Sequence, residues 1–400
     1  MALISLGKIN KKIFIPILGG VLRLIYKFIV YENPKITIFS NNPFLLAIYT
    51  TIGMILAFIP YLILKNQIKR KSININININ NNENSSSVKT QKSKLEIEFE
   101  HYDLYEETKS SKYKLILIAT IFDCLQTLSI FIFCFYCAYN LWIFDIILIS
   151  LFSKLILKTI LYKHQYFSMI IIIILGLGLN IIEYFKKDKN DNNKVDPIEI
   201  IFKIISEICF CLNVVINKLN MEKYFCNSYE ICIWEGLLDL IVISFILLII
   251  NIIGVTISEI DYPQNFYEYI DQFDINDLFL VLLTIIINGL YNMSLIITND
   301  IFTPCHVLIV LFINELYYYF RLKENLMLKI LGLFVLILLF FTFLFFIEVF
   351  ELNLFGLSKN TKKNIEKRSD SDTEIVTNIK DLDTLDIENE NDMNIELNKL

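Results

Sequence analysis

Charge is scarce in this sequence, and it is unevenly placed. Asp, Glu, Lys and Arg make up 20% of the 400 residues, and 55% of the residues are hydrophobic. An average soluble domain carries about 25% charged residues. The charges gather in residues 65–114 and 186–196 and in the tail after Ser358. The net charge of -6 therefore describes loops and tail, and it does not indicate a nucleic-acid partner.

Clusters of metal-ligating residues are also missing. The 3 histidines are scattered, and the 8 cysteines include one CxxC pair, Cys134 and Cys137, with no second pair beside it. A zinc site needs several such ligands at short spacing. A redox or metal role for the pair stays open, but we favour small, lipid-compatible side chains. We expect no metal, no cofactor and no catalytic residue.

Long apolar runs fill most of the chain instead. A membrane-spanning helix needs about 20 mostly apolar residues. On that criterion the sequence predicts about ten spans. They lie near residues 13–30, 43–64, 114–137, 140–161, 167–184, 198–217, 229–254, 277–297, 302–320 and 327–350. We therefore predict an all-α polytopic membrane protein that sits in a lipid bilayer.

The remaining segments differ sharply in composition. Residues 65–112 contain a strict Ile–Asn alternation and then an Asn- and Ser-rich stretch, and residues 351–400 are polar and acidic. Both are predicted to be disordered and cytosolic, and the acidic tail is a candidate contact for a cytosolic partner. The other parts are the first two spans (1–64), the rest of a first repeat (113–184), a loop (185–197) and a second repeat of five spans (198–350).

Lysine and arginine in the loops predict the orientation. With about ten spans both termini share one side of the membrane, and the side with more Lys and Arg is normally the cytosol. Placing the termini there also places most of the loop Lys and Arg there, whereas the opposite loop from Ser258 to Asp277 has none. We expect both termini to be cytosolic.

The two halves of the chain resemble each other. Residues 163–165 (Lys-His-Gln) lead into an apolar run with Gly176 and Gly178, and residues 321–323 (Arg-Leu-Lys) lead into a run with Gly332. Each stretch starts the last helix of a five-helix set. An odd number of helices per half inverts one repeat relative to the other, as in many secondary transporters. The glycines are expected to let helices pack closely.

Single polar residues interrupt the apolar runs. Ionisable groups inside a membrane are costly, so they mark a polar pathway or a buried pair. For the asparagines, hydrogen bonding between helices is the favoured alternative. Glu235, one turn before Asp239, either shares its site or lies at a helix entrance. The candidate solute-binding residues are Lys27, Asp123, Gln126, Glu207, Asn213, Asp239, Asn288, Asn292 and Glu315.

Several spans carry short motifs. These are Asn-Pro-Phe-Leu at 42–45, Lys27, Asp123, Trp-Glu-Gly-Leu-Leu at 234–238 and Ile-Leu-Gly-Leu at 330–333. The set resembles the solute carrier 35 group, its F-type branch in particular, within the EamA-like drug/metabolite transporter superfamily. The resemblance implies two inverted five-helix repeats around a cavity that opens alternately to the cytosol and the lumen. The Gln-x-x-Arg pattern of the fourth helix in that family is missing, which argues against an anionic solute.

The function expected from these features is secondary transport of a small polar organic solute, metabolite-like or nucleotide-sugar-like. The expected location is an endomembrane of the Golgi, lysosome or vacuole. A membrane scaffold or receptor that keeps the fold without transporting is the alternative, and a homodimer is also open. An intramembrane enzyme fits least, because the acids are scattered in depth and form no catalytic cluster.

Overall fold

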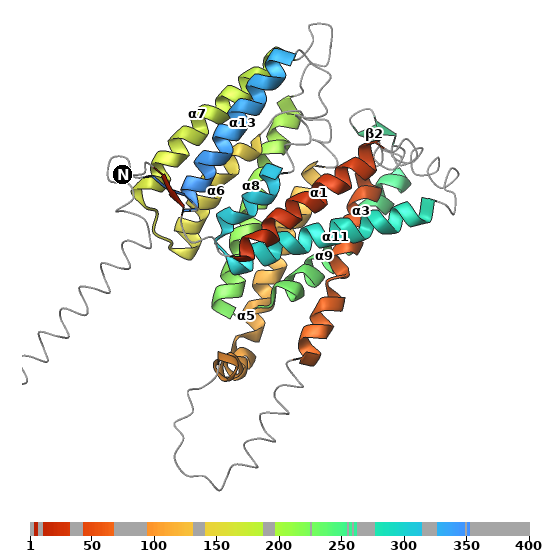
Figure 1. Ribbon diagram of the computed structural model, residues 1–400. Coiled ribbons are helices and arrows are strands. Elements are labelled where there is room, and N and C mark those ends of the chain that lie inside the picture. The colour runs from red at the N-terminus through yellow and green to blue at the C-terminus, as the bar shows by residue number, and fades with distance from the viewer. Residues whose placement is uncertain are drawn as a thin grey trace, which may run out of the picture. The chain divides into compact units, whose positions relative to one another are not determined.

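The structure of this chain, a computed structural model, is nearly all helical (Figure 1). It describes residues 4–6, 11–32, 43–67, 94–130, 141–186, 197–224, 226–253, 256–257, 260–261, 277–313, 326–348 and 350–352. The predictions for residues 68–93, 187–196 and 353–400, for Glu315 and for the motif at 321–323 lie outside these residues.

The main helices follow the predicted spans. They are α1 (Phe14–Glu32), α3 (Pro43–Ile55), α5 (Lys94–Leu128), α6 (Asp145–Phe152), α7 (Lys163–Lys186), α8 (Pro197–Tyr224), α9 (Ser228–Ile253), α11 (Asp277–Ile301) and α13 (Leu326–Phe346). Short helical turns are η1 (Lys11–Ile13), η3 (Leu141–Phe144), the π-helix η4 (Ser153–Leu157) and η5 (Pro304–Val307). Strands β1 (Ile4–Leu6) and β4 (Phe350–Leu352) pair antiparallel, as do β2 (Thr256–Ile257) and β3 (Ile260–Asp261).

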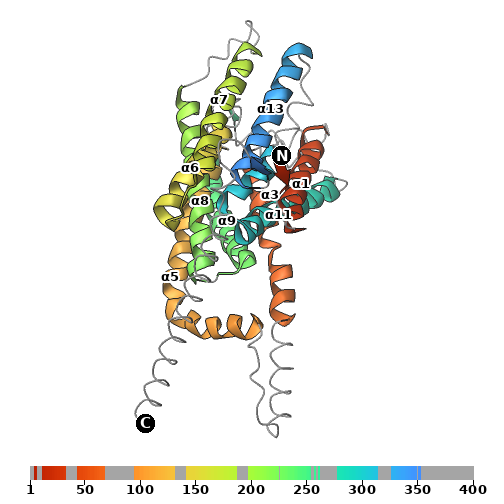
Figure 2. The same cartoon turned by 60° about the vertical axis from the view of Figure 1, so that its left-hand side comes forward.

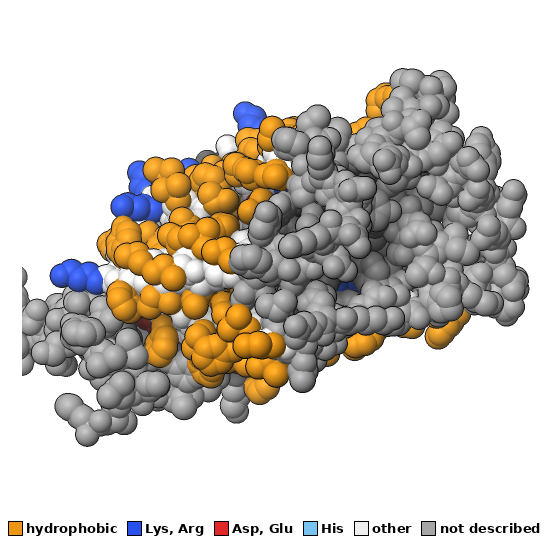
Figure 3. All heavy atoms as spheres, turned by 90° about the horizontal axis from the view of Figure 1, so that it is seen from above, with side chains coloured by type: hydrophobic (Ala, Val, Ile, Leu, Met, Phe, Trp, Pro, Cys, Tyr) orange, Lys and Arg blue, Asp and Glu red, His pale blue; other side chains and the backbone are white. Residues whose placement is uncertain are grey.

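Four of the described helices are long and apolar enough to cross a membrane. They are Ala47–Gln67, Lys163–Ile181, Ile200–Tyr224 and Leu278–Ile301. Large apolar side chains such as Ile174, Phe245 and Phe279 are more than half exposed, and Figure 3 shows apolar side chains covering much of the described surface. A soluble protein rarely exposes so much apolar surface. The predicted helical, membrane-type architecture is confirmed at this level.

Helix α5 begins at Lys94, well before the span predicted from residue 114. The prediction of disorder for residues 65–112 is therefore wrong from Lys94 onward. Leu, Glu and Lys recur in this stretch, and all three have high intrinsic helix propensity. Figure 2 shows this first part of α5 lying across the rest of the helix.

Contacts within the chain divide it into two compact units. The small unit contains residues 1–9, 161–171 and 341–400, and the large unit contains residues 10–160 and 172–340. In the small unit β1 pairs with β4, and His164 Nε2 lies 3.2 Å from a carboxylate oxygen of Glu348. The polar groups considered below all belong to the large unit.

The core of the large unit lies where five of its helices meet. Helix α8 packs against α5, α6 and α11, and α9 packs against α3, α5 and α11. Helix α11 also packs against α1 and α3. One apolar cluster joins α3, α5, α8, α9 and α11 through Met54, Ile116, Met221, Ile231 and Met293. Buried apolar contact thus holds these helices in one bundle.

Glycines set the distance between α3, α9 and α11. A Cβ added to Gly53 would lie 2.5 Å from the carbonyl oxygen of Ile285, and one on Gly236 would lie 2.9 Å from that of Thr51. A Cβ on Gly289 would overlap the backbone of Gly53. The helices therefore touch through bare backbone, as small-residue interfaces in membranes do. Close packing at these three glycines agrees with the role predicted for glycines in general, whereas a Cβ on Gly178 would meet nothing within 4 Å.

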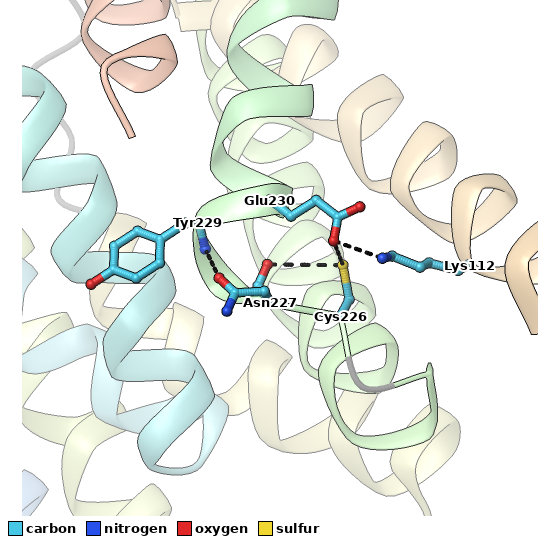
Figure 4. A network of polar contacts seen from close by, with 5 residues as sticks. All are labelled: Lys112, Cys226, Asn227, Tyr229 and Glu230. Carbon is cyan, nitrogen blue, oxygen red and sulfur yellow. Dashed lines mark hydrogen bonds and ion pairs between the residues drawn. The ribbon is translucent and has the colours of Figure 1, made fainter. Parts of the chain in front are cut away.

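A buried ion pair holds α5 against the start of α9 (Figure 4). Lys112 Nζ lies 2.7 Å from Glu230 Oε2, and the two side chains are 1% and 15% exposed. Burial raises the pKa of the Cys226 thiol, so the thiol keeps its proton and donates to the same Glu230 oxygen at 4.0 Å. Asn227 Oδ1 accepts a hydrogen bond from the Tyr229 backbone N–H at 2.9 Å and caps the helix.

Replacing Gly289 by alanine is expected to lower the free energy of unfolding by about 1–3 kcal/mol, because the new methyl group overpacks the contact with Gly53. Gly178→Ala is the matched control, since a Cβ there meets nothing within 4 Å. Unfolding of the purified protein in detergent measures both variants. Equal stability of the two would contradict the close contact between α3 and α11.

Replacing Lys112 by methionine is expected to destabilise the protein by about 2–3 kcal/mol, because the mostly buried Glu230 carboxylate loses its cation. The double variant Lys112→Met with Glu230→Leu removes the unpaired charge and is expected to recover most of this loss. The same detergent unfolding assay checks both proteins. No recovery in the double variant would show that packing of the Lys112 stem, rather than its charge, matters.

Candidate functional site

Polar side chains meet where α5, α8 and α9 pack together. The group contains Asp123 from α5, Asn213 and Asn217 from α8, and Glu235 and Asp239 from α9, and we call it the acid–amide cluster. All of its members except Asp123 are buried, and Asp123 is partly buried. The two asparagines are one helical turn apart, and so are the two acids of α9, so each pair presents one face.

Glu235 is held by two amides. Its Oε1 accepts hydrogen bonds from Asn213 Nδ2 at 3.0 Å and from Asn217 Nδ2 at 2.8 Å. Asn213 also donates to the backbone carbonyl of Ala119 in α5 at 3.2 Å. Glu235 is 2% exposed and lies two turns inside α9. Of the two interpretations of Glu235, the structure therefore supports the shared site and not the helix entrance.

Asp123 and Asp239 form the second half of the cluster. Their carboxyl groups lie within hydrogen-bond reach of each other, and Cys124 Sγ donates to Asp239 Oδ1 at 2.7 Å. A hydrogen bond between two carboxyl groups requires a proton on one of them. Two adjacent carboxylate charges in a water-poor interior repel each other strongly, so sharing one proton is the low-energy arrangement.

A second polar group lies between α6 and α8. Lys203 Nζ is 2.7 Å from Glu207 Oε1 on the same helix. The fully buried Asp145 of α6 lies near this ion pair, and Cys211 Sγ donates to the Asp145 backbone carbonyl at 3.8 Å. We call these four residues the α6–α8 group. It contains one cation and two carboxyl groups.

A third polar group joins α1 and α11. Arg23 Nη1 donates to Asn288 Oδ1 at 3.0 Å. The Arg23 guanidinium also lies 4.7 Å from the ring centroids of Tyr26 and Tyr291. Cation–π contacts of this length stabilise a charge that is partly removed from water. Lys27, one turn along α1, is 3% exposed, so two cations lie on the buried side of this helix.

The predicted site residues divide among these groups. Asp123, Asn213 and Asp239 come together in the acid–amide cluster. Glu207 belongs to the α6–α8 group, and Asn288 bonds Arg23 and Thr50 between α1, α3 and α11. Five of the nine candidate residues are buried, namely Lys27, Glu207, Asn213, Asp239 and Asn288, and the sequence did not predict that they belong to separate groups.

The other predicted residues have simpler surroundings. Asn292 donates to the backbone carbonyl of Asn288 in its own helix at 3.1 Å. Asn299 donates across to the Val214 carbonyl of α8 at 2.7 Å, so it links two helices as predicted for amides. Gln126 is partly exposed on α5. Glu315 lies outside the described residues.

Several members of these groups, among them Asn217, Arg23 and Asp145, were not among the predicted site residues. Asn217 was recognisable from its helical spacing with Asn213. Arg23 was recognisable as a charge inside an apolar run, one turn before Lys27. That charge indicated only that residues 13–30 are a weak candidate for a membrane span. Asp145 was also recognisable as an acid inside the predicted span 140–161, although in the structure it lies at the start of α6, where an acid is ordinary.

Comparison with known proteins adds no family assignment. No protein-family model matches this chain, and no curated protein matches its sequence. The resemblance to the solute carrier 35 group therefore stays a hypothesis that rests on short motifs.

Replacing Asn217 by leucine is expected to lower the free energy of unfolding by about 2 kcal/mol, because the buried Glu235 carboxyl loses a donor. Asn292→Leu is the control, since its amide bonds only its own helix, and we expect a smaller loss. Adding Glu235→Leu to Asn217→Leu should restore part of the stability. Thermal unfolding in detergent measures all three variants, and equal losses for Asn217 and Asn292 would contradict this role.

Proposed function

We propose that the chain is a multi-pass transporter that moves a small polar organic solute across an endomembrane by alternating access. The acid–amide cluster carries this proposal. It places three carboxyl groups and two amides between apolar helices, where polar groups are costly and typically mark a solute or proton pathway. Both termini are assigned to the cytosol on the distribution of Lys and Arg.

Ten spans in two inverted repeats agree with the order of the helices. Each of the ten predicted ranges contains a described helix. In order these are α1, α3, α5, α6, α7, α8, α9, α11, the helix Pro304–Ile313 and α13. We assign the first five to one repeat and the last five to the other.

The packing of the large unit supports this assignment. In this assignment α1, α3 and α5 of the first repeat are equivalent to α8, α9 and α11 of the second. The contact between α1 and α11 is then equivalent to the contact between α8 and α5. The contact of α3 with α11 likewise corresponds to that of α9 with α5, and the contact of α3 with α9 corresponds to itself. All five contacts occur, as a two-fold relation between the halves predicts, whereas the contacts of α11 with α8 and α9 have no comparable contacts of α5 with α1 and α3 among the described residues.

A scaffold or receptor with the same fold is the second candidate. The observation that favours it is the internal pairing of Glu235, whose Oε1 already has two amide donors without a solute. In that case the cluster serves only stability. The two functions therefore predict different results for a conservative substitution of a buried acid. In a transporter the substitution slows solute movement, whereas in a scaffold there is no solute movement to change.

Full-length protein in liposomes is expected to take up at least one solute from a panel of amino acids, nucleosides, amines and nucleotide sugars. Asp239→Asn should slow that uptake by about tenfold or more, an effect of about 1.4 kcal/mol, because it changes the shared carboxyl pair. Glu222→Gln is the control, since Glu222 is 56% exposed. If no solute enters and Asp239→Asn changes no cellular solute pool, the transporter proposal fails and the scaffold is favoured.

A further inference from the structure

The carboxyl group of Asp145 is buried without a hydrogen-bond partner among the described residues. Asp145 is 0% exposed. Neither of its carboxyl oxygens has a hydrogen-bond partner of ordinary length and angle there, although the Glu207 carboxyl group and the Cys211 thiol lie close to it. An ionised carboxylate in such a place has lost its hydration without gaining a hydrogen bond or an ion pair. A carboxylic acid loses far less on burial. The surroundings of Asp145 therefore suit the protonated form.

The groups that face Asp145 do not supply a compensating charge. On α8 these are Lys203, Glu207 and Cys211. Lys203 is already 2.7 Å from Glu207, whose carboxylate is a like charge for Asp145. The Cys211 thiol donates to the Asp145 backbone carbonyl, and Cys305 of η5 lies near Cys211 and contacts Ser150. One cation therefore faces two carboxyl groups.

The start of α6 does not stabilise the charge either. A helix N-terminus favours an anion when the side chain caps the free N–H groups. Here Phe144 is the N-cap residue, no side chain caps the helix, and the Asp145 oxygens bond no backbone N–H. Helix α6 then runs directly into the π-helix η4, which ends at Lys158 in a left-handed conformation with φ 57°. Such π-turns occur frequently at functional sites.

We propose that Asp145 is a proton-binding site that couples proton movement to the movement of α6 against α8. This coupling role rests on the proposed transport function, whereas proton binding itself does not. In the described conformation Asp145 holds a proton. When water enters the α6–α8 interface, the acid gives its proton to water, and hydronium and a hydrated carboxylate form. The reverse reaction restores the acid and closes the interface.

Infrared spectra of the full-length protein in lipid test proton binding without any transport assay. The wild type is expected to show the carbonyl stretch of a protonated carboxylic acid, and Asp145→Asn is expected to lose a distinct component of it. Glu222→Gln, which changes an exposed acid, should keep the band. A full band in Asp145→Asn overturns the proposal. Loss of folding in that variant also contradicts it, because an amide closely matches a neutral acid.

Proton flux tests the coupling. With a transported solute from the panel, wild-type liposomes that contain a pH-sensitive dye are expected to acidify as the solute enters. Asp145→Asn should abolish acidification, and Glu222→Gln should retain it. Solute-dependent acidification by Asp145→Asn overturns the coupling role, as does uptake driven by sodium alone. If no solute enters with the wild type, the proposed function fails, while the infrared result still decides whether Asp145 binds a proton.

Discussion

The two amide hydrogen bonds to Glu235 are the interaction on which the acid–amide cluster depends. Asn213 and Asn217 place α8 against α9, and the second bond of Asn213, to the Ala119 carbonyl, adds α5. Without these donors a carboxyl group would be buried unpaired between apolar helices, which membrane proteins rarely tolerate. Gly236, the next residue, lets α9 touch α3 through its backbone. Close packing and polar pairing therefore fix the same turn of α9.

The two halves of the bundle balance buried charge in different ways. On the α1 side Arg23 is stabilised by an amide and two tyrosine rings. Between α5 and α9, the carboxyl groups of Asp123 and Asp239 instead lie close to each other. A guanidinium cannot give up its proton in a protein, so it must be paired or stacked. A carboxylate can instead be neutralised by taking up a proton.

Composition and spacing predicted the helices and half of the cluster, because both depend on local pattern. Glu235 and Asp239 lie one turn apart, and so do Asn213 and Asn217, so sequence alone places each pair on one face. Which faces meet is a tertiary property, and no spacing predicts it. Asp145 was not a candidate, although it lies inside the predicted span 140–161; its complete burial in the structure is what makes it unusual.

The positions of the cations bear on the proposed proton-binding site. Lys112 pairs with Glu230 at the start of α9, and Lys218 donates to the Asp300 carbonyl near the end of α11. These two lysines lie near helix ends, and Lys203 pairs with Glu207 in the α6–α8 group, so none of the three pairs with an acid of the acid–amide cluster. Acids that lack nearby cations lower their energy by taking up protons. Any movement that admits water reverses this preference, so helix motion and proton release are two aspects of one equilibrium.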